Sequence, residues 1–141
     1  MRDTQTEGAG APGRLARAGD VLVDLAERCD QAQHAGLAAA LDKQAQNIRV
    51  LDLRDVTSFA DYFIICNGTN IRQNQAISDE IEVRLKKLGE YPNSIEGYDN
   101  AEWVLLDYGD YLVHIFTEKS RAYYDLERLW RDAKVVDLAK V

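Results

Sequence analysis

The fold is decided by the stretch from Trp103 to Trp130, which reads WVLLDYGDYLVHIFTEKSRAYYDLERLW. Two β-rich runs, Trp103–Asp107 and Tyr111–Phe116, are separated by Tyr108, Gly109 and Asp110. This pattern predicts a β-hairpin whose turn uses a positive φ at the glycine. One helix is predicted after the second strand, from small and apolar residues at three- and four-residue spacing. These residues are Ala122, Leu126, Leu129 and Ala133.

Upstream of the hairpin, strand and helix patterns alternate. Ile48–Leu53 reads as a strand, and Asp61–Cys66 is apolar enough to be a central strand covered on both faces. Ile71–Leu88 reads as an amphipathic helix that ends at Gly89. Its apolar stripe is Ile77, Ile81, Leu85 and Leu88. A strand followed by a tight loop and a helix predicts a crossover to a parallel strand.

These elements and a short strand at Ser94–Glu96 predict an α/β fold, with a mixed sheet of about five strands flanked by helices. Residues 1–19 have no hydrophobic period, so a disordered tail is expected. Residues 20–46 are expected to be an N-terminal helical region, in which Gly36 either divides two helices or is tolerated within one. The main domain is then 47–134, and residues 135–141 are expected to be a C-terminal tail.

The composition limits the classes of partner. A chain of 141 residues can bury a core, and its net charge of −7 argues against a broad basic surface for DNA. The same charge suits a basic protein partner. Cys29 and Cys66 are expected to be reduced, buried thiols of a cytoplasmic protein. No apolar run is long enough to span a bilayer, so no membrane association is expected.

The sequence gives only weak evidence for a catalytic site. Gly68-Thr69-Asn70 precedes a helix, but without a phosphate-loop motif it is better read as a βα turn. No Asp-x-Asp pair supports a two-metal site, although Asp107 shares a strand face with Trp103 and Leu105. No cofactor or metal is predicted.

Two further candidate groups lie in the hairpin and the last helix. His114 is better read as a hydrogen-bonded structural residue than as a general base, and a Cys–His or Ser–His pair formed in space stays open. On one continuous helix Arg121 and Glu127 are too far apart to pair, whereas Glu127 and Arg131 have the spacing of a surface ion pair. Catalysis is therefore not predicted.

Aromatic residues concentrate in one third of the chain, in the types that dominate protein-binding hot spots. They are Trp103, Tyr111, Tyr123, Tyr124 and Trp130. Trp130, at the edge of the helix stripe, is expected in the core or at its rim. Trp103 follows a polar segment and is a candidate for partial exposure on the sheet face. This concentration favours a protein-binding surface.

Three motifs together resemble the ribosomal silencing factor family, also called the Iojap family. They are ADYFIICNGTNIRQ at 60–73, EGYDNAEWVLLDYGDYLVHIF at 96–116 and RAYYDLERLW at 121–130. The likeness runs from about Ile48 to Ala133 without a large gap.

The resemblance implies a fold related to nucleotidyltransferases but without their active site. It also implies binding to the large ribosomal subunit through ribosomal protein L-fourteen. A bound factor of this kind sterically blocks joining of the small subunit and represses translation under nutrient limitation. Family members commonly form homodimers, and the longer N-terminal region of this chain leaves the dimer arrangement open. The alternatives are a large-subunit assembly factor, as in organelle relatives, and an enzyme that uses Asp107, His114 and Glu127.

The resemblance also assigns candidate residues. The partner-binding set is Trp103, Leu105, Asp107, Arg121, Tyr124 and Glu127. The remaining positions of the family pattern, expected to be structural, are Asp61, Gly68, Arg72, Glu96, Gly97, Gly109, His114 and Leu126. The three glycines among them are expected to meet backbone requirements.

Overall fold

The computed structural model describes residues 31–32 and 34–136. The expected disordered tail at 1–19, the helical region before residue 31, Cys29 and residues 137–141 lie outside the described residues. Residues 34–42 form a continuous helix through Gly36, which is buried and packs close to Ile64. Gly36 is therefore tolerated inside a helix and does not divide two helices there.

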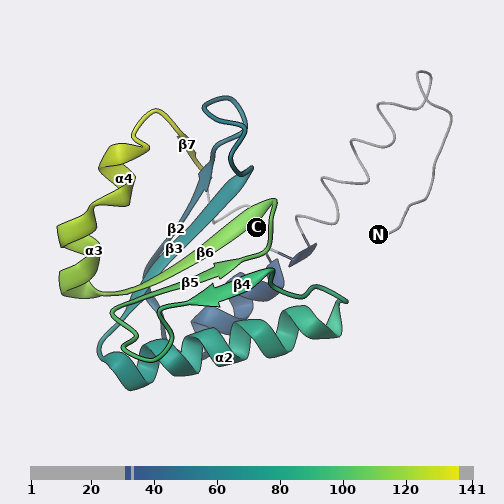
Figure 1. Ribbon diagram of the computed structural model, residues 1–141, viewed down its shortest axis with the longest axis vertical. Coiled ribbons are helices and arrows are strands. Elements are labelled where there is room, and N and C mark those ends of the chain that lie inside the picture. Colours follow the sequence, from purple (N-terminus) through teal and green to yellow (C-terminus); the bar gives the residue numbers. More distant parts are fainter. Residues whose placement is uncertain (1–30, 33, 137–141) are drawn as a thin grey trace, which may run out of the picture. The chain divides into compact units, whose positions relative to one another are not determined.

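In the part of the chain that the structure describes, one six-stranded mixed sheet forms the centre, in the order β4-β5-β6-β3-β2-β7 (Figure 1). The strands are β2 (Gln46–Asp52), β3 (Tyr62–Gly68), β4 (Ser94–Glu96), β5 (Trp103–Asp107), β6 (Tyr111–Thr117) and β7 (Lys134–Val135). The helices are α2 (Ile71–Lys87), α3 (Glu118–Tyr124) and α4 (Leu126–Leu129). β3 and β6 are parallel, and the other neighbouring pairs are antiparallel. The predicted mixed α/β fold, hairpin and crossover are confirmed, with one strand more than expected.

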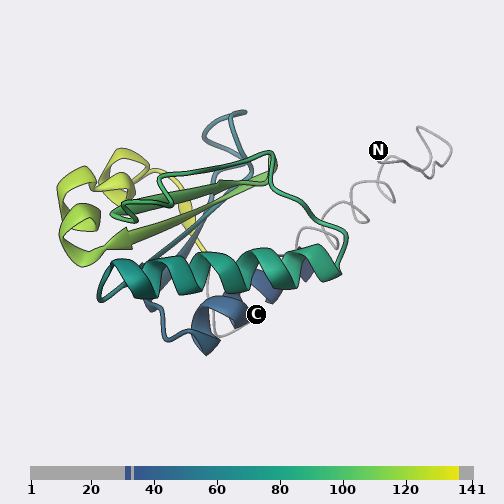
Figure 2. The ribbon, with the colours of Figure 1, turned by 60° about the horizontal axis from the view of Figure 1, so that its bottom comes forward.

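The sheet has two differently covered faces (Figure 2). On the first face, α2 and the helix at 34–42 cover a core that includes Val50, Ile64, Val104, Val113 and Ile115. On the second face lie α3 and α4, over a smaller core that includes Phe63, Ile65, Leu112 and Phe116. β3 contributes to both cores, as its continuous apolar run predicts.

The long helix α2 is defined by its caps and its apolar stripe. Asn70 is the N-cap, and its side-chain oxygen accepts a hydrogen bond from the N–H of Gln73 at 2.8 Å. Ile77, Ile81 and Leu85 are buried, as predicted. Leu88 is half-exposed, so its assignment to the stripe was wrong: it is the C-cap, where the helical spacing no longer applies.

The single helix predicted after the hairpin is also wrong. α3 ends at Tyr124, Asp125 takes a left-handed conformation with φ 49° and ψ 53°, and α4 begins at Leu126. Aspartate tolerates this conformation better than most residues do, so the chain turns here without a glycine. The segment after α4 ends in the short strand β7 beside β2.

Gly97 provides a test of the backbone requirement at a turn. It has φ +76°, and an added Cβ would overlap the carbonyl oxygen of Trp103. We expect Gly97→Ala to lower the free energy of unfolding by more than the roughly 1–2 kcal/mol that a left-handed alanine costs alone. Gly89→Ala is the matched control, because Gly89 has φ +80° with open space around it. Urea denaturation measures both; equal losses would contradict the steric argument.

A candidate protein-binding surface on the second face of the sheet

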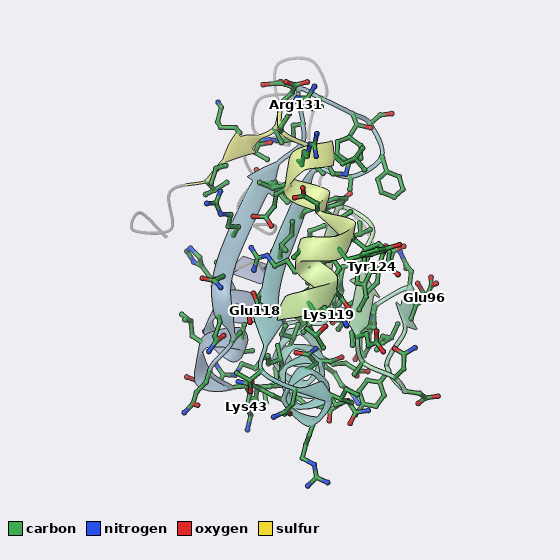
Figure 3. The ribbon with its side chains drawn as sticks, turned by 90° about the vertical axis from the view of Figure 1, so that its left-hand side faces the viewer. Lys43, Glu96, Glu118, Lys119, Tyr124 and Arg131 are labelled. Carbon is green, nitrogen blue, oxygen red and sulfur yellow. The ribbon has the colours of Figure 1, made fainter. Side chains whose placement is uncertain are left out.

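The second face is incompletely covered over β5. Along this strand Val104 and Leu106 are fully buried on the first face, whereas Trp103, Leu105 and Asp107 are half-buried on the second. Tyr124 projects from α3 on the side of β5 and β4 (Figure 3). We call the group formed by Trp103, Leu105 and Tyr124 the aromatic surface. Trp103 is partly exposed here, as the polar segment before it predicts.

Ring contacts hold the aromatic surface together. The ring of Trp103 lies 4.7 Å from that of Tyr124 and 5.0 Å from that of Phe116, centroid to centroid. Tyr123 packs edge-on against Tyr124 at 5.0 Å. Tyr124 is 50% exposed and Tyr123 is 80% exposed, so the outer part of the cluster is accessible to a partner. Large aromatic side chains with few rotatable bonds lose little entropy when they bind a partner.

His114 fixes the orientation of Trp103. The indole Nε1–H donates a hydrogen bond of 3.1 Å to Nδ1 of His114, which must therefore be unprotonated on that nitrogen. His114 is buried, and desolvation lowers its pKa to about 3. His114 is hydrogen-bonded as predicted, and its purely structural role stays a prediction. Because the only donor of the Trp103 ring is already used, that ring offers a partner an apolar face alone.

Arg121 forms the central polar contacts beside the aromatic surface. It donates to both carboxylate oxygens of Glu127, at 3.0 and 3.2 Å, and its Nη1 donates to the Asn47 carbonyl and the Asn67 side chain. The expectation that Arg121 and Glu127 do not pair was wrong, because the turn at Asp125 brings them together. Glu127 forms its second ion pair with Arg49 at 3.4 Å, and not with Arg131.

Asn47 and Asn67 are polar neighbours of Arg121 that sequence reasoning missed. They lie 74 and 54 residues from Arg121, so no local spacing indicates their contact with it. Asn67 is buried at the end of β3, and Asn47 takes a positive φ of 51° within β2. An asparagine inside a strand is the one sequence signal that points to such a polar contact.

The comparisons with known proteins agree with this structure. A family model described as "Ribosomal silencing factor during starvation" matches residues 26–141. The chain belongs to this family. A ribosomal silencing factor of Bacillus subtilis is 46% identical over 101 residues, which is 72% of this chain and 86% of the relative. A chloroplastic Iojap protein of Zea mays is 34% identical over 103 residues, covering 71% of this chain and 43% of the relative.

Two solved structures show the same fold. One is a protein of Chromobacterium violaceum, with a TM-score of 0.70 and 34% identity, covering 72% of this chain and 84% of the other. The second is from Bacillus halodurans, with a TM-score of 0.69 and 35% identity, covering 77% and 98%. The likeness to the silencing factor family found in the three sequence motifs is thereby confirmed.

Asp107 and Asp61, two acidic positions of the family pattern, both form hydrogen bonds at turns. Asp107 accepts a hydrogen bond of 2.8 Å from the N–H of Gly109, which has φ +86° in the hairpin turn. Asp61 donates its backbone N–H to the carbonyl of Asp110 at 2.7 Å. Burial, with the charge of Asp110 nearby, raises the pKa of the Asp61 carboxyl.

The remaining pattern positions lie apart from one another. Gly68 begins the turn into α2, where an added Cβ would overlap the side-chain oxygen of Asn74. Arg72 is exposed on α2, and Glu96 is exposed on β4 directly across from Leu105. Leu126 packs against the second core, as does Trp130, which lies edge-on to Phe63 at 5.9 Å. Trp130 is half-buried, so its expected position in the core or at its rim is confirmed.

The described residues show no metal centre. In residues 31–32 and 34–136, no three His, Cys, Asp or Glu side chains are grouped so that they could hold a metal ion. Cys66 is a free, buried thiol, and burial raises its pKa to about 12. None of the helices in the described part of the chain has the length and apolar character to cross a membrane.

The buried His114 predicts a pH dependence of stability. Its folded-state pKa of about 3 lies below the unfolded value near 6.5, so the unfolded chain binds the extra proton as the pH falls through 6.5. The contribution of His114 to the free energy of unfolding is present above pH 6.5. Between pH 6.5 and 4.5 the free energy of unfolding falls by about 2–3 kcal/mol. His114→Gln retains an acceptor for Trp103 and removes this loss.

Urea unfolding at several pH values tests the prediction. All other titratable groups are common to both proteins, so the difference between the two curves reports His114. Curves that stay parallel from pH 7.5 to 4.5 would show that the histidine does not titrate differently in the folded state.

Proposed function

We propose that this protein silences ribosomes. In this proposal it binds the large ribosomal subunit through ribosomal protein L-fourteen, sterically blocks joining of the small subunit and represses translation under nutrient limitation. The observation that carries the proposal is the accessible aromatic surface, in a chain whose relatives are named ribosomal silencing factors. The proposed setting is the cytoplasm, and the proposed assembly is a homodimer.

The chemistry of the aromatic surface suits a basic protein partner. Trp103 and Tyr124 supply large apolar area of the kind that dominates hot spots. Glu96 lies opposite Leu105 on β4, and Asp107 follows on the same face of β5, so carboxylates flank the apolar centre. The chain as a whole carries a net charge of −7. Such an arrangement steers a basic partner electrostatically, while the desolvated rings provide most of the affinity.

Arg121 lies on α3 with Tyr124, and Glu127 lies on α4. Their bidentate ion pair joins α3 to α4, and the Arg121 side chain is largely buried. In this proposal Arg121 and Glu127 hold Tyr124 in position. Trp103, Leu105 and Tyr124 contact the partner directly. Asp107 holds the hairpin turn at the end of the same strand.

Steric blocking requires no catalysis. The three residues of the enzyme alternative are each engaged in a structural contact: Asp107 with the Gly109 N–H, His114 with Trp103, and Glu127 with Arg121. The relatives are named for a regulatory role, which fits a protein that is not an enzyme. Metal-dependent nucleotide turnover that is abolished by Asp107→Asn would overturn this view.

Sedimentation with purified large subunits tests the proposal. We expect the wild-type protein to co-migrate with large subunits and to reduce the joined ribosomes formed when small subunits are added. Trp103→Ala and Tyr124→Ala should weaken binding by about 30-fold or more each, because truncation of a hot-spot aromatic costs roughly 2 kcal/mol or more. Tyr91→Ala is the control, since Tyr91 is 64% exposed outside the aromatic surface.

The outcomes separate the alternatives. If Trp103→Ala and Tyr124→Ala bind large subunits as tightly as the wild-type protein and the Tyr91→Ala control do, the aromatic surface is not the contact. Binding to precursor particles but not to mature large subunits would favour the assembly factor. A wild-type protein that stays at the top of the gradient, with joining unaffected, would contradict silencing.

A further inference from the structure

Phe59 is a large apolar side chain that the fold leaves exposed. It lies in the loop between β2 and β3, and its exposed fraction is 65%. Its ring packs edge-on against Phe63 of the second core, with 6.5 Å between the ring centroids. Phe63 in turn lies 4.5 Å from the ring of His114, the residue that is hydrogen-bonded to Trp103. Phe59 is therefore joined to the aromatic surface by a chain of rings on the second face of the sheet.

The loop that carries Phe59 is fixed at several points by hydrogen bonds. The N–H of Leu53 donates to the carbonyl of Asp61 at 2.8 Å and closes the base of the loop. The N–H of Phe59 itself donates to Oγ1 of Thr57 at 3.1 Å. Asp61 also donates its N–H to the carbonyl of Asp110 in the hairpin turn. Because the backbone under Phe59 is already held in place, a partner that binds its ring orders little more than the side chain.

Phe59 and the aromatic surface lie at opposite ends of the same strands. Phe63, against which Phe59 packs, is opposite Leu112 near the start of β6. Trp103 is opposite Phe116 near the end of β6. These two points are four residues apart along the strand, which is roughly 13 Å. A stable protein interface commonly buries about 800 Å² on each partner, so one partner can cover both ends.

Carboxylates flank Phe59 as they flank the aromatic surface. Burial and the neighbouring charge of Asp110 raise the pKa of the Asp61 carboxyl, so the two like charges act on each other. The guanidinium of Arg54, in the same loop, donates to both carboxylate oxygens of Asp52, at 3.0 and 2.8 Å. A cation from a partner would relieve the repulsion between Asp61 and Asp110. This end of the second face therefore also suits a basic protein.

We propose that Phe59 is a second anchor for the same basic protein partner, which spans the second face from Phe59 to the aromatic surface. This inference rests on the proposed function, because it extends the surface proposed to bind the large subunit. The partner buries the exposed ring of Phe59, and its Lys or Arg side chains face Asp61 and Asp110. A second copy of this chain is a poor occupant of this surface, because each copy carries a net charge of −7 and would bring carboxylates against carboxylates.

Binding of large subunits by two matched variants tests the energetic contribution. Phe59→Ala should weaken binding by about tenfold, because truncation of an anchoring aromatic removes roughly 1.4 kcal/mol. Tyr91→Ala is the control, because Tyr91 is 64% exposed and also lies between a helix and a strand. Its affinity should stay within about twofold of the wild-type value. Circular dichroism of both variants checks that the fold is retained.

Chemical protection tests the contact directly. The thiol introduced by Phe59→Cys should lose reactivity toward N-ethylmaleimide when large subunits are added at a saturating concentration. The thiol introduced by Tyr91→Cys should react at the same rate with and without large subunits. Peptide mass spectrometry assigns each modification to its position and separates it from Cys66, which is buried.

The outcomes separate this inference from the silencing proposal. If the wild-type protein does not bind large subunits, both fail. If the wild-type protein binds and Phe59→Ala binds equally tightly, Phe59 is not an anchor, and the silencing proposal rests on the aromatic surface alone. If Phe59→Ala binds weakly but the introduced thiol stays reactive in the complex, the residue acts only through the fold, which also overturns the inference.

Discussion

The ion pair between Arg121 and Glu127 is the constraint on which the second face of the sheet depends. A largely buried guanidinium must have its donors satisfied, and here they are satisfied by Glu127, by the Asn47 carbonyl and by the Asn67 side chain. These partners belong to α4, β2 and β3, so one side chain joins the last helices to two strands. The left-handed turn at Asp125 is the local conformation that allows it. Because α3 and α4 are held over β3 and β6, the second face remains open at β5.

That opening determines the character of the surface. Trp103 is seated between Phe116, Tyr124 and His114, and its single donor is used internally. The result is a rigid apolar platform without an unsatisfied indole group. A neutral imidazole costs less to bury than a carboxylate would, although Nε2 of His114 is itself buried without a hydrogen-bond partner in the described residues. The residue that looked like a possible base in the sequence is thus part of what orients the rings of the surface.

The parts of the structure that could be predicted are those with local signals. The turn at Gly109, the central strand β3 and the end of α2 before Gly89 follow from glycine conformation and hydrophobic period, each within a few residues. The break at Asp125 and strand β7 could not be predicted in this way. They depend on contacts between residues more than 50 positions apart. In addition, the helical spacing of apolar residues over 122–133 continues through Asp125, so it gives no sign of the break.

The two faces also differ in what substitutions on them would change. The first face carries the larger core, so the loss of a side chain there mainly lowers stability. On the second face Tyr124 is half-exposed, so its ring contributes less to the fold and is open to the partner that we propose. β7 pairs with β2 at Leu51 and Asp52 and covers that end of the sheet edge without any residue of the aromatic surface. Stability and binding can therefore be altered separately by substitution.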